Sequence, residues 1–148
     1  MASTSTEHVE TDERDVLGAI RAFIRTFESF DVDAMVAAWD DKAEQIVYQP
    51  EERAVPMFSI AEVREYASTL PTFFVKATDV SMIDKKVLVV GGATAHVYLR
   101  LSCDIELTSG RHINGQLRQS FMLTKRDGAW RLVHYHESRQ SDFDLPAD

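Results

Sequence analysis

Two runs of alternating apolar and polar residues in the last third of the chain constrain its fold most strongly. They span residues 115–124 and 130–138, and the pair Asp127-Gly128 lies between them. Asp and Gly tolerate the positive φ angles of a tight turn, so this pattern predicts a β-hairpin. The second run carries His-Tyr-His-Glu-Ser at 134–138. A strand this polar is expected to line a polar-rimmed cavity or to form a hydrogen-bonded interface.

The first half of the chain has helical patterns. Apolar residues three or four apart predict a helix that begins at Thr11 or Asp12. A short helix is expected from Asp31 or Asp33, and a short strand at 45–49. A third helix should open with the capping box formed by Ser59 and Glu62 and end at Pro71. The residues that define the first apolar face are Val16, Leu17, Ile20, Phe23, Ile24 and Phe27.

After Phe73 the apolar period changes from helical to two, which predicts a set of antiparallel strands. Helices first and antiparallel strands after them indicate an α+β domain. A strand as long as 93–107 must curl, and a sheet curled around the first helix leaves a partly filled cone that could hold a ligand. The expected strands are 75–83, 87–90, 93–107, 113–124 and 130–139, joined by turns at 84–86, 91–92, 108–110 and 127–128.

Composition limits the function classes. The chain has 148 residues, of which 24 are acidic and 16 basic, for a net charge of −8. This charge argues against nucleic acid or an anionic membrane surface as a partner. Cys103 is the single cysteine, so no internal disulfide can form and a cytoplasmic location is expected. We expect a disordered leader at 1–11, one domain at 12–139 and a flexible tail at 140–148.

Four segments together resemble the nuclear transport factor 2-like superfamily, and within it SnoaL-like proteins and the association (hub) domain of calcium/calmodulin-dependent kinases. The resemblance implies a cystatin-like, cone-shaped α+β barrel in which a curved antiparallel sheet wraps the N-terminal helices. It also implies a homodimer through the outer face of the sheet. The superfamily includes isomerases, cyclases, dehydratases, hydrolases and hubs, so chemistry must come from the site. The segments are 31–39, 48–51, 98–101 and, most specific, Arg-Asp-Gly-Ala-Trp-Arg-Leu-Val-His-Tyr-His-Glu-Ser at 126–138.

The family's known sites can be compared with this chain position by position. Where the ketosteroid isomerases of the superfamily have a catalytic Asp, this chain has Gln49, and their Tyr and Asp oxyanion donors fall on Phe23 and Ser120. The ketosteroid isomerase mechanism is therefore disfavoured. Of the three pocket arginines of the hub domain, only Arg100 is matched, and Glu137 and a phenylalanine replace the others. Carboxylate binding is accordingly not expected.

The candidate catalytic residues are His134, His136 and Tyr48. The two histidines share one strand face and could act as general acid and base, because imidazole titrates near neutral pH. Alternatively, they form hydrogen bonds across a dimer seam; as metal ligands they would need a further donor such as His96 or Glu106. No metal or cofactor is expected. The candidate substrate-binding residues are Trp39, Tyr66, Tyr98, Arg100, Arg118, Ser120, Tyr135 and Glu137.

Other charged residues receive simpler interpretations. Arg118 is expected to pair with Glu137 or Glu106, because a buried arginine needs a partner. Four carboxylates are interpreted as surface charges. They are Asp40, Asp41, Glu51 and Glu52.

The strand at 130–139 leaves one question open, because its parity decides which side chains face the cavity. The pattern of Trp130 and Leu132 favours the even set with His134, His136 and Ser138. The hub resemblance favours the odd set with Val133, Tyr135 and Glu137. A β-bulge would reconcile the two.

Two functions remain open at this point. The first is a protein that binds a small hydrophobic ligand. In its enzymatic form it is a cofactor-independent isomerase, cyclase or dehydratase that acts on a carbonyl-bearing metabolite of polyketide or steroid type. The second is a non-catalytic dimerisation or hub module with a vestigial pocket. A cavity above about 300 Å³ with convergent polar groups favours the first, and a filled cone with a broad apolar sheet face favours the second.

Overall fold

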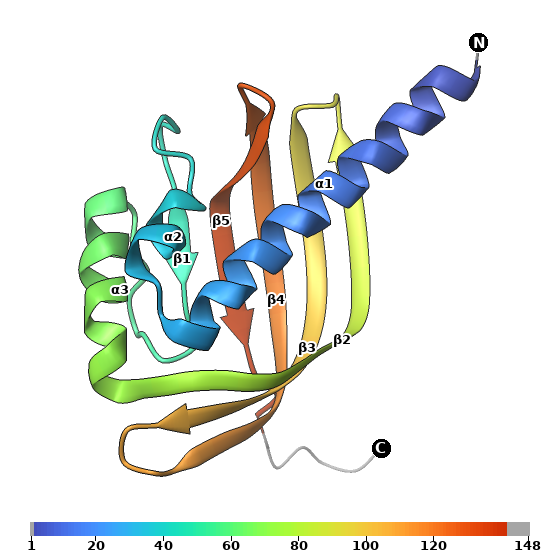
Figure 1. Cartoon of the computed structure of the whole chain (residues 1–148). Helices are drawn as coiled ribbons and strands as arrows, with labels where there is room; N and C mark the ends of the chain where they lie inside the picture. Colours follow the sequence, from blue (N-terminus) through green and yellow to red (C-terminus); the bar gives the residue numbers. More distant parts are fainter. Residues whose placement is uncertain (1, 142–148) are drawn as a thin grey trace, which may run out of the picture.

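The computed structural model describes residues 2–141, with side chains from residue 7, and shows an α+β fold (Figure 1). The chain forms three helices and five strands, and all three helices precede the four long strands. In order they are α1 (Ala2–Ser29), α2 (Val32–Ala37), β1 (Val47–Gln49), α3 (Ile60–Phe73), β2 (Phe74–Val90), β3 (Thr94–Leu107), β4 (His112–Arg126) and β5 (Ala129–Ser138).

The five strands form one curved sheet in the order β1-β5-β4-β3-β2. The long strands β2 to β5 are antiparallel neighbours, as predicted, whereas β1 pairs parallel with β5. The sheet is therefore mixed, and it is open, because the edge strands β1 and β2 do not pair with each other. The α+β architecture expected from the sequence, a curved sheet around the N-terminal helices, is confirmed, and the parallel pairing of β1 is the one departure from an antiparallel sheet. The edge strand β1 contributes only three residues to the sheet.

Helix α1 covers one face of the sheet, which we call the inner face (Figure 1). Val16, Ile20 and Phe23 are buried along one stripe of the helix, as its apolar spacing predicts. The helix begins at Ala2, so residues 2–11 are helical where the sequence predicted a disordered leader. These residues contain neither Gly nor Pro, and the helix can extend outward from its buried part. Most of the predicted tail at 140–148 lies outside the described residues.

The helix caps follow the sequence closely. Asp31 caps α2 by accepting a hydrogen bond from the backbone of Ala34, and Ser59 caps α3 by accepting one from Glu62. Pro71 does not end α3 as predicted, because the helix continues to Phe73 and then passes directly into β2. A proline in the last turn removes one backbone donor and leaves the later ones intact. Here the backbone N–H of the capping residue still reaches the carbonyl of residue 70.

Strand β2 is continuous, so the turn predicted at 84–86 is wrong. Its pairing with β3 instead shifts register at three places, including the step from Met82 to Asp84. Such bulges bend and twist a strand without ending it. The bend lets β2 run from the end of α3, around the base of the molecule and along the far edge of the sheet (Figure 1).

The β4–β5 hairpin is confirmed, with Asp127 and Gly128 at φ angles of 53° and 78°. A bulge at Val133 settles the parity of β5, because Leu132 pairs with Leu123 and His134 pairs with the adjacent Met122. Before the bulge the even residues are buried against the core, and after it the odd residues are.

Within residues 2–141, no helix combines the length and apolar character that crossing a membrane requires. Nor does this part of the chain bring together three His, Cys, Asp or Glu side chains in a geometry that could hold a metal ion.

Candidate functional site

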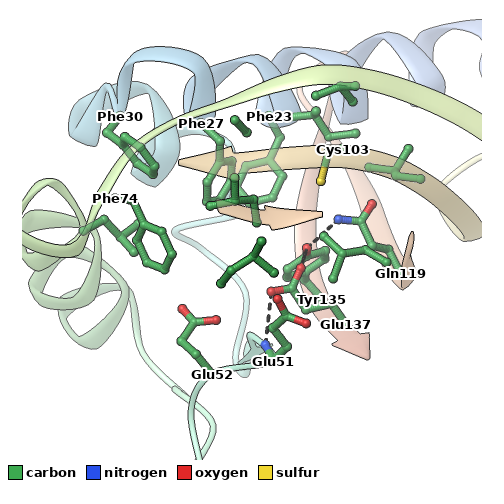
Figure 2. Close-up of a pocket in the computed structure, with 18 of the residues that line it drawn as sticks. Phe23, Phe27, Phe30, Glu51, Glu52, Phe74, Cys103, Gln119, Tyr135 and Glu137 are labelled. Carbon is green, nitrogen blue, oxygen red and sulfur yellow. Dashed lines mark hydrogen bonds between the residues drawn. The ribbon is translucent and has the colours of Figure 1, made fainter. Parts of the chain in front are cut away.

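A cavity of about 120 Å³ lies between α1 and the inner face of the sheet (Figure 2). It reaches the surface, because its lining includes the exposed residues Glu52 and Val80. The wall is mostly apolar and aromatic, and polar side chains gather on one side. The apolar wall includes Phe23, Phe27, Phe30, Phe74, Leu101 and Cys103.

Edge-to-face aromatic contacts hold this wall in place. Phe23 lies 5.4 Å from Phe27 and 5.6 Å from Tyr135 between ring centroids. Phe30 adopts a φ of 50° directly after α1, a conformation that is costly for a bulky side chain. Its ring stacks on Phe74 at 6.0 Å, and this contact helps to hold the residue there. The end of α1 is thereby fixed against the start of β2 at the cavity wall.

A chain of hydrogen bonds crosses the polar side of the cavity (Figure 2). The amide Nε2 of Gln119 donates to the hydroxyl of Tyr135 at 2.7 Å. That hydroxyl in turn donates to Oε2 of Glu137, and the backbone N–H of Glu51 donates to Oε1 at 3.1 Å. Both oxygens of the Glu137 carboxyl are thus oriented, although no arginine or lysine of the described chain forms an ion pair with it.

The pKa of Glu137 is raised from 4.5 to about 7. Burial is the main cause, and the negative charges of Glu52 and Glu51 add to it, while the hydrogen bonds from Tyr135 and from the Glu51 backbone oppose it. A carboxyl group with this pKa exchanges its proton readily near neutral pH, which suits a general acid or base.

The mouth of the cavity is acidic. Glu51 forms an ion pair with Arg139 at 2.6 Å, and both side chains are largely buried, so Glu51 is not the free surface charge expected from the sequence. The hydroxyl of Tyr66 donates to the exposed Glu52. Burial is the main reason that the pKa of Tyr66 is raised, so this hydroxyl keeps its proton. With Glu137, three carboxyl groups gather here beside two guanidinium groups, those of Arg139 and of Arg53, which lies over the Tyr66 ring at 5.6 Å.

Gln119 is a buried polar lining residue that was not among the predicted site residues. Its side chain is only 5% exposed, and its Oε1 has no hydrogen-bond partner within the described chain. The sequence held a signal: Gln119 is polar at an inner-face position between Leu117 and Phe121, where strand alternation predicts an apolar residue.

Five of the predicted site residues lie at or beneath the cavity. Tyr66, Tyr135 and Glu137 line it. Tyr48 and Trp39 do not; they are buried with their rings 5.1 Å apart, in the aromatic cluster that supports Tyr135.

The other predicted site residues lie outside the cavity. His134 and His136 follow the bulge and project from the outer face of the sheet, beside Tyr98 and Ser120. Burial, followed by the charges of His136 and His96, lowers the pKa of His134.

Both arginines of the predicted site are engaged on the outer face. Arg100 pairs with Asp84 at 2.6 Å. Arg118 donates to the hydroxyl of Ser138 and to the carbonyl of Arg139, and it does not pair with Glu137 or Glu106 as expected. The reason is strand parity: positions 100 and 118 alternate with buried neighbours, so their side chains point away from the cavity.

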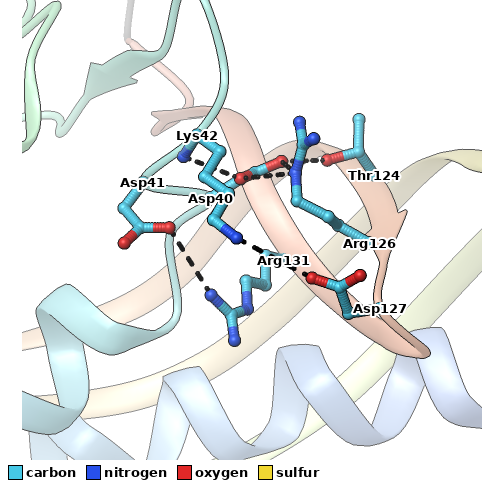
Figure 3. Close-up of polar contacts among 7 residues, drawn as sticks. All are labelled: Asp40, Asp41, Lys42, Thr124, Arg126, Asp127 and Arg131. Atoms are coloured by element: carbon cyan, nitrogen blue, oxygen red, sulfur yellow. Dashed lines mark hydrogen bonds and ion pairs between the residues drawn. The ribbon is translucent and has the colours of Figure 1, made fainter.

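A second buried carboxyl group lies away from the cavity, at the hairpin end of β4 (Figure 3). Asp40 is 1% exposed, which corrects its interpretation as a surface charge. It accepts hydrogen bonds from the backbone of Lys42 at 3.0 Å, from Thr124 at 2.9 Å and from Arg126 at 3.1 Å. Burial alone would raise the pKa of Asp40, but these bonds and the charge of Arg126 lower it below its usual value. The cluster ties the segment after α2 to the hairpin.

Residues 16–141 match the family model described as the SnoaL-like domain. The chain belongs to this family. As a SnoaL-like protein it has the α+β architecture that the sequence resemblance implied. No curated protein matches it in sequence.

Solved structures share the fold of this SnoaL-like chain at low sequence identity. A nuclear transport factor 2-like superfamily protein from Salmonella enterica has 16% identity and a TM-score of 0.79, with 93% of this chain and 96% of that one covered. A ketosteroid isomerase-like protein from Erwinia carotovora has 19% identity and a TM-score of 0.74, covering 87% and 96%. The association domain of C. elegans CaMKII has 17% identity and a TM-score of 0.67, covering 88% and 97%. Similarity at this level establishes the fold alone.

Proposed function

We propose that this protein is a cofactor-independent acid–base enzyme, an isomerase, cyclase or dehydratase, that acts on a small hydrophobic carbonyl compound. The observation that carries the proposal is Glu137, a carboxyl group oriented at the polar side of an apolar cavity with a pKa of about 7. Names of structural neighbours add support, since one is called ketosteroid isomerase-like and another a dehydratase of this fold.

The proposed chemistry begins with proton removal by Glu137. Its ionised carboxylate takes a proton from the carbon next to the substrate carbonyl, and the C–H bonding electrons move to the carbonyl oxygen to give an enolate. In a β,γ-unsaturated substrate this enolate is conjugated with the carbon–carbon double bond, and neutral Glu137 returns the proton to the γ carbon, which completes an isomerisation. If a hydroxyl group stands on the β carbon, the enolate electrons form the new double bond and expel it, and it leaves as water with the proton of neutral Glu137, which completes a dehydration instead. The hydrogen bonds from Tyr135 and the Glu51 backbone stabilise the carboxylate before proton removal and after proton return.

The cavity favours a smaller substrate than the sequence suggested. Its volume of about 120 Å³ is below the roughly 300 Å³ expected of a small-molecule site, so the proposal rests on the convergent polar groups around Glu137 and not on the size of the cavity. A ligand of steroid or polyketide size would have to extend through the mouth. We therefore place a single ring inside the cavity, beside Glu137.

The test is the isomerisation of 3-cyclohexenone to the conjugated 2-cyclohexenone. The reaction is monitored by the absorbance of the product and by deuterium uptake in D₂O. The protein should accelerate it over buffer, and Glu137→Gln should lower that acceleration by about 10²- to 10⁴-fold, the usual contribution of a general base. His136→Gln is the matched control, because His136 lies on the outer face and the variant should keep full activity. Activity that survives Glu137→Gln, or that is lost in His136→Gln, would contradict the assignment.

A homodimer through the outer face of the sheet is proposed as well. Leu88 is 60% exposed, and it lies with Tyr98 and His96 around a shallow depression on this face. Such apolar exposure on a sheet is typical of an interface. The alternative function, a structural hub, fits the same exposed face, and one solved structure of this fold is named an association domain. A cytoplasmic location remains the expectation from the single cysteine.

Leu88→Glu tests the dimer, because a charge would be placed in the apolar centre of the interface. We expect the measured mass by light scattering to fall from two chains to one. Val55→Glu is the control, since Val55 is 62% exposed in the loop between β1 and α3 and should leave the mass unchanged. A wild-type protein that is already monomeric would contradict the proposed homodimer.

A further inference from the structure

The hydroxyl group of Tyr135 lies between two partners and has a single proton to donate. Its oxygen accepts a hydrogen bond from Nε2 of Gln119 at 2.7 Å, and its proton goes to Oε2 of Glu137. A hydroxyl group rotates to suit its neighbours, and here an N–H group faces the oxygen from the side of Gln119. The proton must therefore point to Glu137, so the orientation of the Gln119 amide decides which partner receives it.

The opposite orientation of the amide would have the opposite effect. With Oε1 turned toward Tyr135, the amide would accept the hydroxyl proton, and Glu137 would lose this donor. In the observed orientation Oε1 is buried and has no partner in the described part of the chain, which is a cost. A chain of hydrogen bonds that ends on a carboxylate is stronger than a neutral one, and this gain favours the observed orientation when Glu137 is ionised.

The other surroundings of Glu137 leave Tyr135 as the decisive donor. Among the described residues, Tyr135 is the only side chain that donates to the Glu137 carboxyl, and its second donor is the backbone N–H of Glu51. Helix α1 and strand β2 present only apolar side chains to the cavity. The ionisable side chains around Glu137 from the remaining elements are Tyr48, Glu51, Glu52, Arg53, Tyr66, Cys103, Tyr135 and Arg139.

We propose that Gln119 is a positioning residue, whose Nε2 group fixes the Tyr135 hydroxyl as a donor to Glu137 and thereby favours the ionised carboxylate. The inference deepens the proposed function and rests on it for the role of Glu137 as general base. A hydroxyl group that accepts a hydrogen bond is also polarised into a better donor. Burial raises the pKa of Tyr135, and the bond from Gln119 opposes this rise, as expected for a polarised hydroxyl group.

The test follows the side-chain carboxyl carbon of Glu137 by ¹³C NMR in a pH titration of the full chain without substrate. Glu137→Gln identifies the signal by removing it. Gln119→Met keeps a similar length and has no N–H group, so the titration midpoint of Glu137 should rise by about 0.3 to 0.5. Gln116→Met is the matched control, since Gln116 lies on the same strand, exposed and bonded to Arg100, and the midpoint should stay in place. An unchanged midpoint in Gln119→Met would overturn the proposal, and a fall would show that the amide accepts the hydroxyl proton instead.

The Tyr135→Phe background separates positioning from a general effect of polarity at position 119. Because Gln119 acts through the Tyr135 hydroxyl, Gln119→Met should leave the midpoint unchanged in a protein that already carries Tyr135→Phe. An equal rise in both backgrounds would mean that the amide acts on Glu137 directly, and the assignment would fail. The wild-type protein supplies a measurement that needs no folded variant: the Nε2 signals of Gln119 should shift with the midpoint of the Glu137 carboxyl. Signals that do not follow this titration would contradict the assignment.

The two proposals fail separately, because the titration of Glu137 is measured without turnover. If no isomerisation of 3-cyclohexenone is seen and the midpoints move as expected, the positioning role of Gln119 stands and the enzymatic proposal falls. If Glu137→Gln loses isomerisation but Gln119→Met leaves the titration unchanged, only the assignment of Gln119 falls.

Discussion

Asp40 and Glu137 are both buried carboxyl groups, yet their surroundings give them opposite properties. Asp40 accepts hydrogen bonds from a backbone N–H, a hydroxyl and a guanidinium, and its pKa is lowered. Glu137 accepts hydrogen bonds from a hydroxyl and one backbone N–H, has two neighbouring carboxylates and forms no ion pair with the described residues, and its pKa rises to about 7. The difference separates a group that holds the fold together from one that can exchange a proton.

The largest effect is expected from Asp40→Ala, which leaves Arg126 and Thr124 without their shared partner. We expect the free energy of unfolding to fall by about 2 to 3 kcal/mol, less than for a fully buried pair because Arg126 is partly exposed. Urea denaturation measures it. Asp41→Ala is the control: Asp41 is 64% exposed and only loosely paired with Arg131, so its loss should cost below about 0.5 kcal/mol. Equal losses in the two variants would show that burial of Asp40 contributes nothing.

Glu137→Gln should change stability in a pH-dependent way. Because the pKa of Glu137 is raised, folding takes up a proton between pH 4.5 and about 7, and wild-type stability falls as pH rises through that window. Relative to wild type, the variant should therefore gain about 2 kcal/mol between pH 4.5 and pH 8, a value reduced for partial exposure.

Asp40→Ala provides the contrast in sign. The pKa of Asp40 is lowered, so its stabilisation is present above about pH 3.8 and is lost as pH falls, and the deficit of the variant should shrink in acid. Denaturation curves at several pH values compare the two variants. Parallel pH slopes would contradict the difference between the two groups.

The smallest effect is expected from Tyr135→Phe, which removes the hydroxyl that donates to Glu137. Losing one hydrogen bond to the carboxylate, worth about 1 kcal/mol, should raise the pKa of Glu137 further. The midpoint of the pH profile of 3-cyclohexenone isomerisation should then move upward. Tyr48→Phe is the matched control, because Tyr48 is a buried neighbour that makes no hydrogen bond to Glu137, and the profile should stay in place. A downward shift in Tyr135→Phe would mean that the hydroxyl does not stabilise the carboxylate.

Strand β5 shows how far sequence reasoning reached into the site. Local alternation predicted the strand and its turn, and it left both parities of the strand open. The answer depended on the bulge at Val133, which comes from how β5 pairs with β4. Without it the two histidines appeared to be the natural acid–base groups, whereas the bulge turns Tyr135 and Glu137 toward the cavity.

The sequence by itself determined the elements whose causes are local: the apolar stripe of α1, the caps at Asp31 and Ser59, and the Asp127-Gly128 hairpin. It also determined the family, through the residues of β5. Only the tertiary structure decided that the sheet stays open, that Asp40 is paired, and that Gln119 and Glu137 face one cavity. These properties depend on neighbours distant in the chain, and periodicity within one segment carries no information about them.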